Sequence, residues 1–185
     1  MASTGARAVP EATLVDSPDR ASWQAVVAYL LMAMGMFMSI LDIQIVSASL
    51  LQIQAGLSAS ADEISWVQTS YLVAEIVMIP LSGFLARAMS IKWLFVASAA
   101  GFTVASVLCA TADTIGEMIL FRAIQGFVGG AMIPTVYSAD FLMFGRARQG
   151  SLMVVVSIIV TLAPTLGPSI GGVISDALGW KWLFL

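Results

Sequence analysis

Five apolar runs, each about as long as a bilayer crossing, restrict this chain to very few folds. They cover residues 26–46, 64–85, 93–110, 115–137 and 151–174, and a sixth begins at residue 182. Backbone polar groups in lipid need internal partners, so such runs form helices or a closed barrel. Barrel strands would be about 10 residues long and alternate in polarity. The runs therefore predict an all-α membrane protein with five complete transmembrane helices and the start of a sixth.

The composition excludes several other classes of protein. Only 10% of the 185 residues are charged and 59% are hydrophobic, which is more apolar surface than a soluble domain can hide. The net charge is −3 without a basic stripe, so we expect no nucleic-acid binding. The chain has no histidine and only one cysteine, Cys109. Zinc sites built on Cys and His, internal disulfides and histidine catalysis are therefore excluded. We expect no metal, no cofactor and no enzyme activity.

The charges outside the runs predict the topology. Residues 1–22 are small and polar and indicate a short tail, which precedes one helical bundle over residues 23–185. If the runs alternate in direction, six cations fall on one side: Arg7, Arg20, Arg87, Lys92, Arg146 and Arg148. The opposite connections are acidic, with Lys181 as their only cation. Since cytoplasmic loops carry the excess of Lys and Arg, we expect a cytoplasmic N-terminus in the inner membrane.

Three ionisable side chains, Asp42, Glu75 and Arg122, lie within the predicted spans. Each is costly against lipid and should face the bundle interior or a cavity. With a helical rise of ~1.5 Å per residue, Asp42 and Arg122 reach a similar depth in the outer half of the membrane. We hypothesise that they interact; the alternative is a separate partner for each, such as Gln125 for Arg122. Glu75 lies near mid-membrane. Three interpretations are open for it: a proton site, a cation-recognition site, or a carboxyl that is protonated or hydrogen-bonded to a neighbouring helix.

A carboxylate beside a fixed cation suits proton-coupled transport. In a site that opens alternately to each side, the carboxylate can bind a proton in one state and release it in the other. An arginine keeps its proton, so Asp42 is the predicted carrier.

Glycine and proline gather in the fourth and fifth runs. Gly126 and Gly130 form a GxxxG step, which allows close packing of membrane helices, and we assign Gln125, Gly126 and Gly130 to helix packing. The fifth run combines prolines, which remove backbone hydrogen bonds and bend a helix, with glycines that let a second helix approach. These residues are Pro164, Gly167, Pro168, Gly171 and Gly172.

Several motifs, in this order, resemble one family. Residues 41–46, Leu-Asp-Ile-Gln-Ile-Val, are similar to the LDxTIV motif that ends the first span of drug:proton antiporters in the major facilitator superfamily. Residues 122–126 match RxxQG in the fourth span, and residues 167–172 match the GPxxGG core of the antiporter motif in the fifth. Residues 66–71 fit the second span, and residues 179–184 resemble GWRWIF at the start of the sixth. Residues 25–185 thus resemble the fourteen-span EmrB/QacA-type branch.

The resemblance implies a proton-driven exporter of drugs or other lipophilic small molecules, whose first six helices form the N-terminal bundle. It implies that Asp42 and Arg122 serve proton coupling and that Pro168 and its glycines shape a bend that favours antiport. It also suggests a periplasmic adaptor as a partner, beside membrane lipid and the small-molecule substrate. The alternative is a narrow-substrate metabolite transporter of the same fold.

One motif of the family is altered here. The loop after the second span usually reads GxLaDRxGRkr and latches the cytoplasmic gate, whereas residues 83–92 retain Gly83 and Lys92 but carry Arg87 at the acidic position. The family's charge relay is therefore not expected in its usual form.

The chain stops inside its sixth apolar segment. Transport by rocking needs two bundles around a central site. We therefore expect an incomplete N-terminal bundle, lacking its C-terminal partner bundle and inactive alone.

Overall fold

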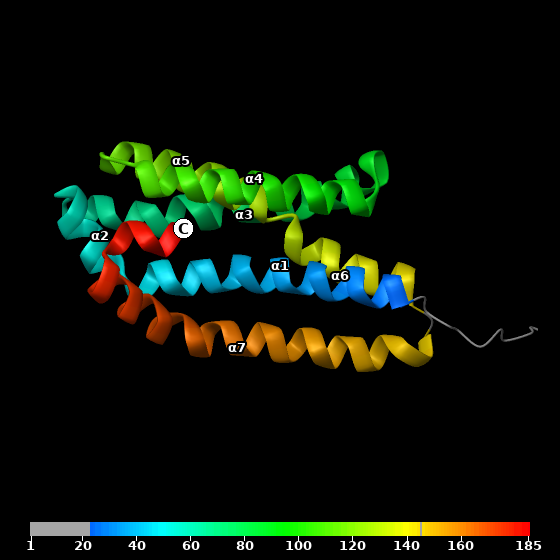
Figure 1. The fold of residues 1–185 in the computed structure, drawn as a ribbon. Helices are drawn as coiled ribbons and strands as arrows, with labels where there is room; N and C mark the ends of the chain where they lie inside the picture. Colours follow the sequence, from blue (N-terminus) through cyan, green and yellow to red (C-terminus); the bar gives the residue numbers. More distant parts are fainter. Residues whose placement is uncertain (1–22, 145) are drawn as a thin grey trace, which may run out of the picture.

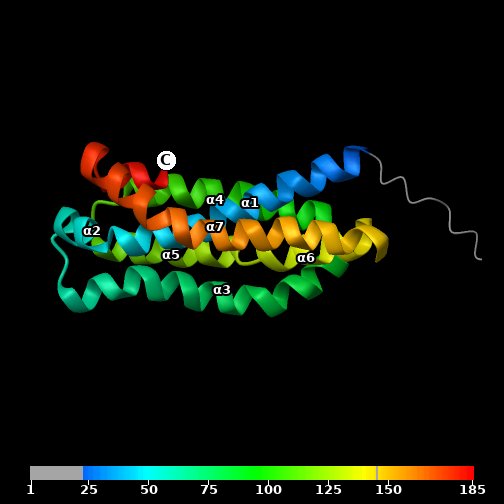
Figure 2. The ribbon, with the colours of Figure 1, turned by 90° about the horizontal axis from the view of Figure 1, so that it is seen from below.

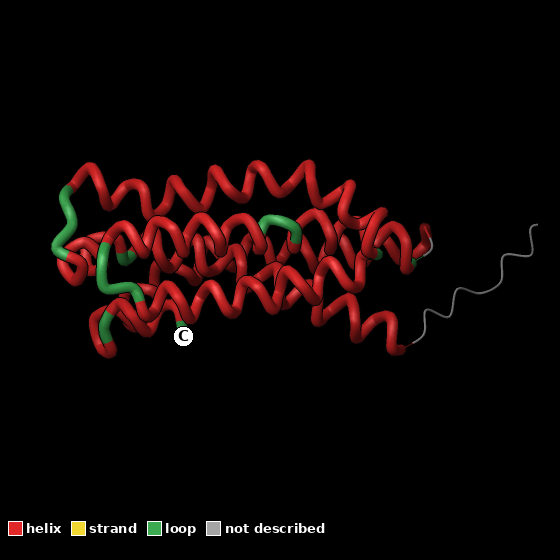
Figure 3. Tube along the Cα trace, turned by 90° about the horizontal axis from the view of Figure 1, so that it is seen from above, coloured by secondary structure: helices red, strands yellow, loops and turns green. Residues whose placement is uncertain are grey.

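A computed structural model describes residues 23–144 and 146–185, with side chains for 23–144 and 150–185; the predicted tail lies outside the described residues. Their backbone forms seven α-helices and one 3-10 helix, without a strand (Figures 1 and 3). The elements are α1 (Trp23–Ala48), α2 (Leu50–Leu57), α3 (Ala61–Met89), α4 (Ile91–Thr111), α5 (Ile115–Gly129), α6 (Met132–Met143), α7 (Arg146–Leu178) and η1 (Trp180–Phe184).

Five stretches of the described chain are helical, long and apolar enough to cross a membrane. Four are α1, α3, α4 and α7 from Gly150, and the fifth is α5 followed by α6. The predicted all-α fold class is therefore confirmed, and the protein is a multi-pass membrane protein.

Local sequence signals set where two of the helices begin. At the start of α3, the Ser60 hydroxyl accepts a hydrogen bond from the Glu63 backbone while the Glu63 carboxylate accepts one from the Ser60 backbone. Thr114 and Glu117 form the same reciprocal pair at the start of α5. Such capping boxes satisfy backbone N–H groups that a helix leaves free in its first turn.

The structure differs from the expected connections at two places. The segment expected as a polar connection after the first span forms α2, because Ile53 is fully buried in an apolar cluster with Val67 and Met118. Asp140, expected in the connection after the fourth span, instead lies on α6, and α7 already begins at Arg146.

The fourth crossing is broken in its middle, where the sequence suggested one continuous run. Helix α5 ends at Gly129 and α6 begins at Met132, with Gly130 and Ala131 between them (Figure 3). Glycine has a low helix propensity. Pro134 lies in the first turn of α6, a position where proline's missing N–H is tolerated.

Glycines set two close helix contacts. A Cβ added to Gly126 would collide with the backbone carbonyl of Tyr71 on α3, and one on Gly130 would lie 3.0 Å from the Glu75 carbonyl oxygen. On α7, a Cβ on Gly167 would collide with the Gln44 side chain of α1. One on Gly171, a turn later, would approach the Ile45 carbonyl oxygen to 2.9 Å. The first glycine pair thus lets the backbone of α5 lie directly on that of α3, and the second lets α7 lie directly on α1.

The connections sort into two ends of the bundle. The start of α1, the α3–α4 junction, the end of α6 and the start of α7 lie at one end; α2, the α4–α5 connection and η1 lie at the other (Figures 1 and 2). Arg87 and Lys92 belong to the first end. At the second end, Lys181 forms an exposed ion pair of 3.1 Å with Asp113.

Candidate functional site

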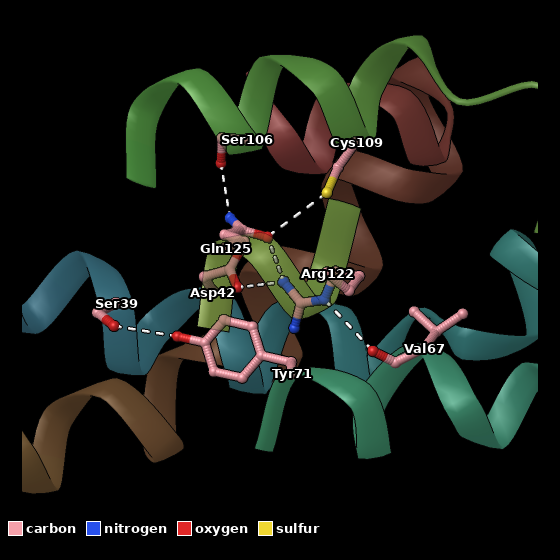
Figure 4. Close-up of polar contacts among 8 residues, drawn as sticks. All are labelled: Ser39, Asp42, Val67, Tyr71, Ser106, Cys109, Arg122 and Gln125. Atoms are coloured by element: carbon pink, nitrogen blue, oxygen red, sulfur yellow. Dashed lines mark hydrogen bonds and ion pairs between the residues drawn. The ribbon is translucent and has the colours of Figure 1, made fainter. Parts of the chain in front are cut away.

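A buried ion pair joins α1 to α5. The Nη1 atom of Arg122 lies 2.6 Å from Oδ2 of Asp42, although the two residues are 80 positions apart in the chain (Figure 4). Arg122 is 0% exposed and Asp42 is 8% exposed. The hypothesis that these two residues interact is confirmed.

The Arg122 guanidinium has further partners. Its Nη1 donates to Oε1 of Gln125 at 2.7 Å, and its Nε donates to the Val67 carbonyl of α3 at 3.5 Å. Its Nη2 has no hydrogen-bond partner within the described part of the chain. Both sequence alternatives therefore hold together, since Arg122 binds Asp42 and also Gln125.

Gln125 is the centre of the polar contacts around this ion pair. Its Nε2 donates to Oδ1 of Asp42 at 3.3 Å and to the Ser106 hydroxyl of α4 at 2.9 Å. Its Oε1 also accepts from the Cys109 thiol at 3.5 Å. The sequence assigned Gln125 to helix packing; the structure gives it hydrogen bonds to α1 and α4 and to Arg122 of its own helix. The signal was its spacing of three residues from Arg122, which places both on one helix face.

Tyr71 of α3 closes the other side of the guanidinium. Its ring centre lies 4.3 Å from Cζ of Arg122, and its hydroxyl is 3.1 Å from the Ser39 hydroxyl of α1 (Figure 4). The residue is fully buried. An aromatic face attracts a guanidinium, most strongly without water. Tyr71, Ser39 and Ser106 were not among the site residues predicted from the sequence.

Glu75 lies one helical turn beyond Tyr71 on α3. It is 7% exposed, and its Oε1 has no hydrogen-bond partner among the described residues. It lies close enough to Arg122 and Asp42 to interact with both electrostatically. All three ionisable residues predicted within the spans therefore share one region. Because Asp42 already neutralises Arg122, an ionised Glu75 would leave a net negative charge there.

Two cavities border the predicted residues. One of about 310 Å³ lies between α1, α4 and η1 and reaches Asp42, with Thr103 and Ser106 as further polar lining. The other, of about 990 Å³, lies at the end of the bundle where α1 begins, beside the α3–α4 junction and the end of α6. Gly83, Arg87 and Lys92, the predicted gate-loop residues, all line this second cavity.

The residues of the antiporter motif do not reach the ion pair, but they lie against the helix that carries Asp42. Gly167 and Gly171 face Gln44 and Ile45 of α1, whereas a Cβ on Gly172 would meet nothing within 4 Å. Pro164 and Pro168 remain within α7, which curves over its C-terminal half (Figure 1). This motif therefore fixes α7 to the turn of α1 that follows Asp42.

Among the described residues, no group of three or more acidic or cysteine side chains could hold a metal ion.

Known proteins resemble this chain closely. The family profile described as Major Facilitator Superfamily matches residues 32–185. The colistin resistance protein EmrB of Acinetobacter baumannii is 45% identical over 168 residues, which cover 91% of this chain and 32% of that protein. The fatty acid resistance protein FarB of Neisseria gonorrhoeae is 36% identical over 86% of this chain and 32% of its own length.

Multidrug resistance protein 3 of Bacillus subtilis is 35% identical over 89% of this chain and 32% of its own length. The chain thus spans about a third of the length of the curated relatives it matches. The family match covers most of the chain and agrees with the motif resemblance. The chain belongs to the major facilitator superfamily, a family of membrane transporters rather than enzymes.

Proposed function

We propose that these residues form the N-terminal bundle of a proton-coupled efflux transporter for drugs or other lipophilic small molecules. The proposal places the protein in the inner membrane, with its N-terminus in the cytoplasm. The buried pair of Asp42 and Arg122 carries it, because ionisable side chains within membrane spans are costly and rare and typically mark ion or proton pathways. The names of the three relatives, which are all resistance proteins and include a multidrug resistance protein, support export.

Asp42 is the proton carrier in this proposal. When Asp42 is ionised, it holds Arg122 at 2.6 Å. When it binds a proton, the ion pair is lost, but Arg122 keeps Gln125, the Val67 carbonyl and the Tyr71 ring. Arg122 stays buried and charged in both states, so protonation changes mainly the attachment of α1 to α5. Since α7 is fixed to α1 by Gly167 and Gly171, such a change extends to α7.

Glu75 is a second carboxyl in the coupling region. Burying an unpaired carboxylate costs much more free energy than burying a neutral carboxyl. No cavity described above reaches Glu75, so a proton suits it better than a bulky cationic substrate.

The remaining parts of the transporter are proposals as well. A second bundle would complete the central site, so these 185 residues alone should confer no resistance. A periplasmic adaptor would carry the substrate onward in a bacterium with two membranes.

The test uses inside-out membrane vesicles that contain the full-length protein and hold a pH gradient. Adding a lipophilic cation such as ethidium should release protons from wild-type vesicles. Asp42→Asn should abolish both proton release and ethidium transport. Asp62→Asn, which removes an exposed carboxylate from the same bundle, should leave both unchanged.

Transport at the wild-type rate by Asp42→Asn would overturn the assigned proton carrier. Proton release with a single metabolite, and with no lipophilic compound, would instead assign the narrow-substrate alternative.

A further inference from the structure

A third buried carboxyl group, besides Asp42 and Glu75, lies far from the ion pair, on α6. Asp140 is fully buried, and neither of its carboxyl oxygens has a hydrogen-bond partner among the described residues. It belongs to the last turn of α6, where the backbone N–H of Phe144 donates to the Asp140 carbonyl. The C-terminus of a helix carries partial negative charge, which disfavours an ionised carboxylate.

Tyr29 of α1 brings another buried polar atom to the same place. It is fully buried, its hydroxyl has no hydrogen-bond partner in the described chain, and its ring packs edge-on against Phe144 at 5.4 Å. The hydroxyl lies close enough to Asp140 to interact with its charge. Unsatisfied buried polar atoms are rare in native proteins and call for a specific explanation. Here, three of them belong to Tyr29 and Asp140, on the two helices of the α1–α6 contact.

The surrounding elements offer no described countercharge. On α6, the nearby ionisable group is Tyr137, which also interacts with Tyr29. From Gly150 onward, α7 has no ionisable side chain before Asp176. Arg87 and Lys92 line the large cavity beside Ala139 and Met143 of α6, and Asp140 is not among the described residues that line it. An ionised Asp140 would therefore be a buried charge without a charged partner among the described side chains.

We propose that Asp140 binds a proton in this conformation, and that Asp140 with Tyr29 forms a second protonation site at the end of the bundle where α1 begins. Tyr29 interacts electrostatically with Asp140, and a tyrosine hydroxyl is able either to donate to a carboxylate or to accept from a protonated carboxyl. Tyr29 and Asp42 are 13 residues apart on α1, about 20 Å at the helical rise. The site is thus separate from the ion pair. Its protonation does not depend on the proposed transport, but its use as a proton station in transport does.

Infrared spectroscopy of the purified full-length protein at pH 7 tests the site directly. The spectrum of wild type minus Asp140→Asn should show the C=O stretch of one protonated carboxyl. The spectrum of wild type minus Asp62→Asn should show carboxylate bands instead, because Asp62 is exposed. Asp140→Glu keeps a carboxyl group at this position and should therefore keep the band of a protonated carboxyl. This variant shows that the band is lost in Asp140→Asn because the carboxyl is removed, and not because the side chain is changed. Tyr29→Phe should shift the frequency of the Asp140 band.

Carboxylate bands in the Asp140→Asn difference spectrum would overturn the proposal, since Asp140 would then be ionised with some other partner. An unchanged frequency in Tyr29→Phe would overturn the part played by Tyr29. The vesicle assay then tests the role in transport: Asp140→Asn should lower the proton release per ethidium exported. If wild-type vesicles move no substrate while the infrared band is present, the proposed function fails and the protonation site stands.

Discussion

The ring of Tyr71 covers the guanidinium of Arg122, with 4.3 Å between the ring centre and Cζ. This contact does not depend on the protonation of Asp42. It gives the buried arginine a favourable surface on α3 whether or not the ion pair on α1 is formed.

Removing the Tyr71 ring should therefore destabilise the protein more than removing its hydroxyl. Tyr71→Leu should lose about 2 kcal/mol of cation–π attraction, the range for desolvated pairs. Tyr71→Phe keeps the ring and loses only the bond to Ser39, as does Ser39→Ala, so these two variants should match each other. Thermal unfolding of the full-length protein in detergent measures all three. Equal losses of stability in Tyr71→Leu and Tyr71→Phe would show that the ring does not stabilise Arg122.

Substitutions of Asp42 and Arg122 should not be additive. Asp42→Asn leaves Arg122 as a buried charge without its counter-ion, a change that costs about 3–5 kcal/mol in buried pairs. Arg122→Gln likewise leaves Asp42 as a buried charge without its counter-ion. The double variant removes both charges and should be much more stable than the sum of the single losses predicts. A double-variant cycle on the free energy of unfolding measures this, and a sum within error would contradict a direct coupling.

Adding one methyl group at Gly126 should separate α3 from α5. The new Cβ would collide with the Tyr71 backbone, which cannot rotate away as a side chain can. Gly126→Ala should cost about 1–3 kcal/mol, as overpacking does in cores. Gly172→Ala is the control, because its Cβ meets nothing within 4 Å and alanine favours a helix. Melting temperatures should fall for the first variant and hold or rise for the second.

Ser90→Gly should stabilise the junction of α3 and α4. Ser90 has φ 73° and ψ 150°, a backbone region that is almost restricted to glycine. Relief of this strain should contribute about 1 kcal/mol or more. Ser58→Gly is the comparison, because φ 51° and ψ 37° is the ordinary left-handed region and should gain less. An unchanged unfolding temperature for Ser90→Gly would contradict the assigned strain.

The helices and the ion pair could be predicted from the sequence because lipid imposes strong constraints. An apolar run of sufficient length has few alternatives to a helix. The helical rise then fixes the depth of each charge, which placed Asp42 and Arg122 at a similar level.

The other contacts of the site depend on helix rotation, which the sequence did not reveal. In a helix that is apolar all round, a buried aromatic residue such as Tyr71 looks like one that faces lipid. Asp140 was expected in a connection because polar residues follow the apolar run. The break at Gly130 was missed because glycine is also common in unbroken membrane helices, where it serves packing.

The interruption of the fourth crossing gives its two halves different neighbours. Helix α5 carries Arg122 and lies against α3 and α4, whereas α6 carries Asp140 and also contacts α1 and α7. Gly130 and Ala131 therefore separate the half that holds the buried ion pair from the half that holds Asp140, whose carboxyl oxygens have no hydrogen-bond partner in the described chain.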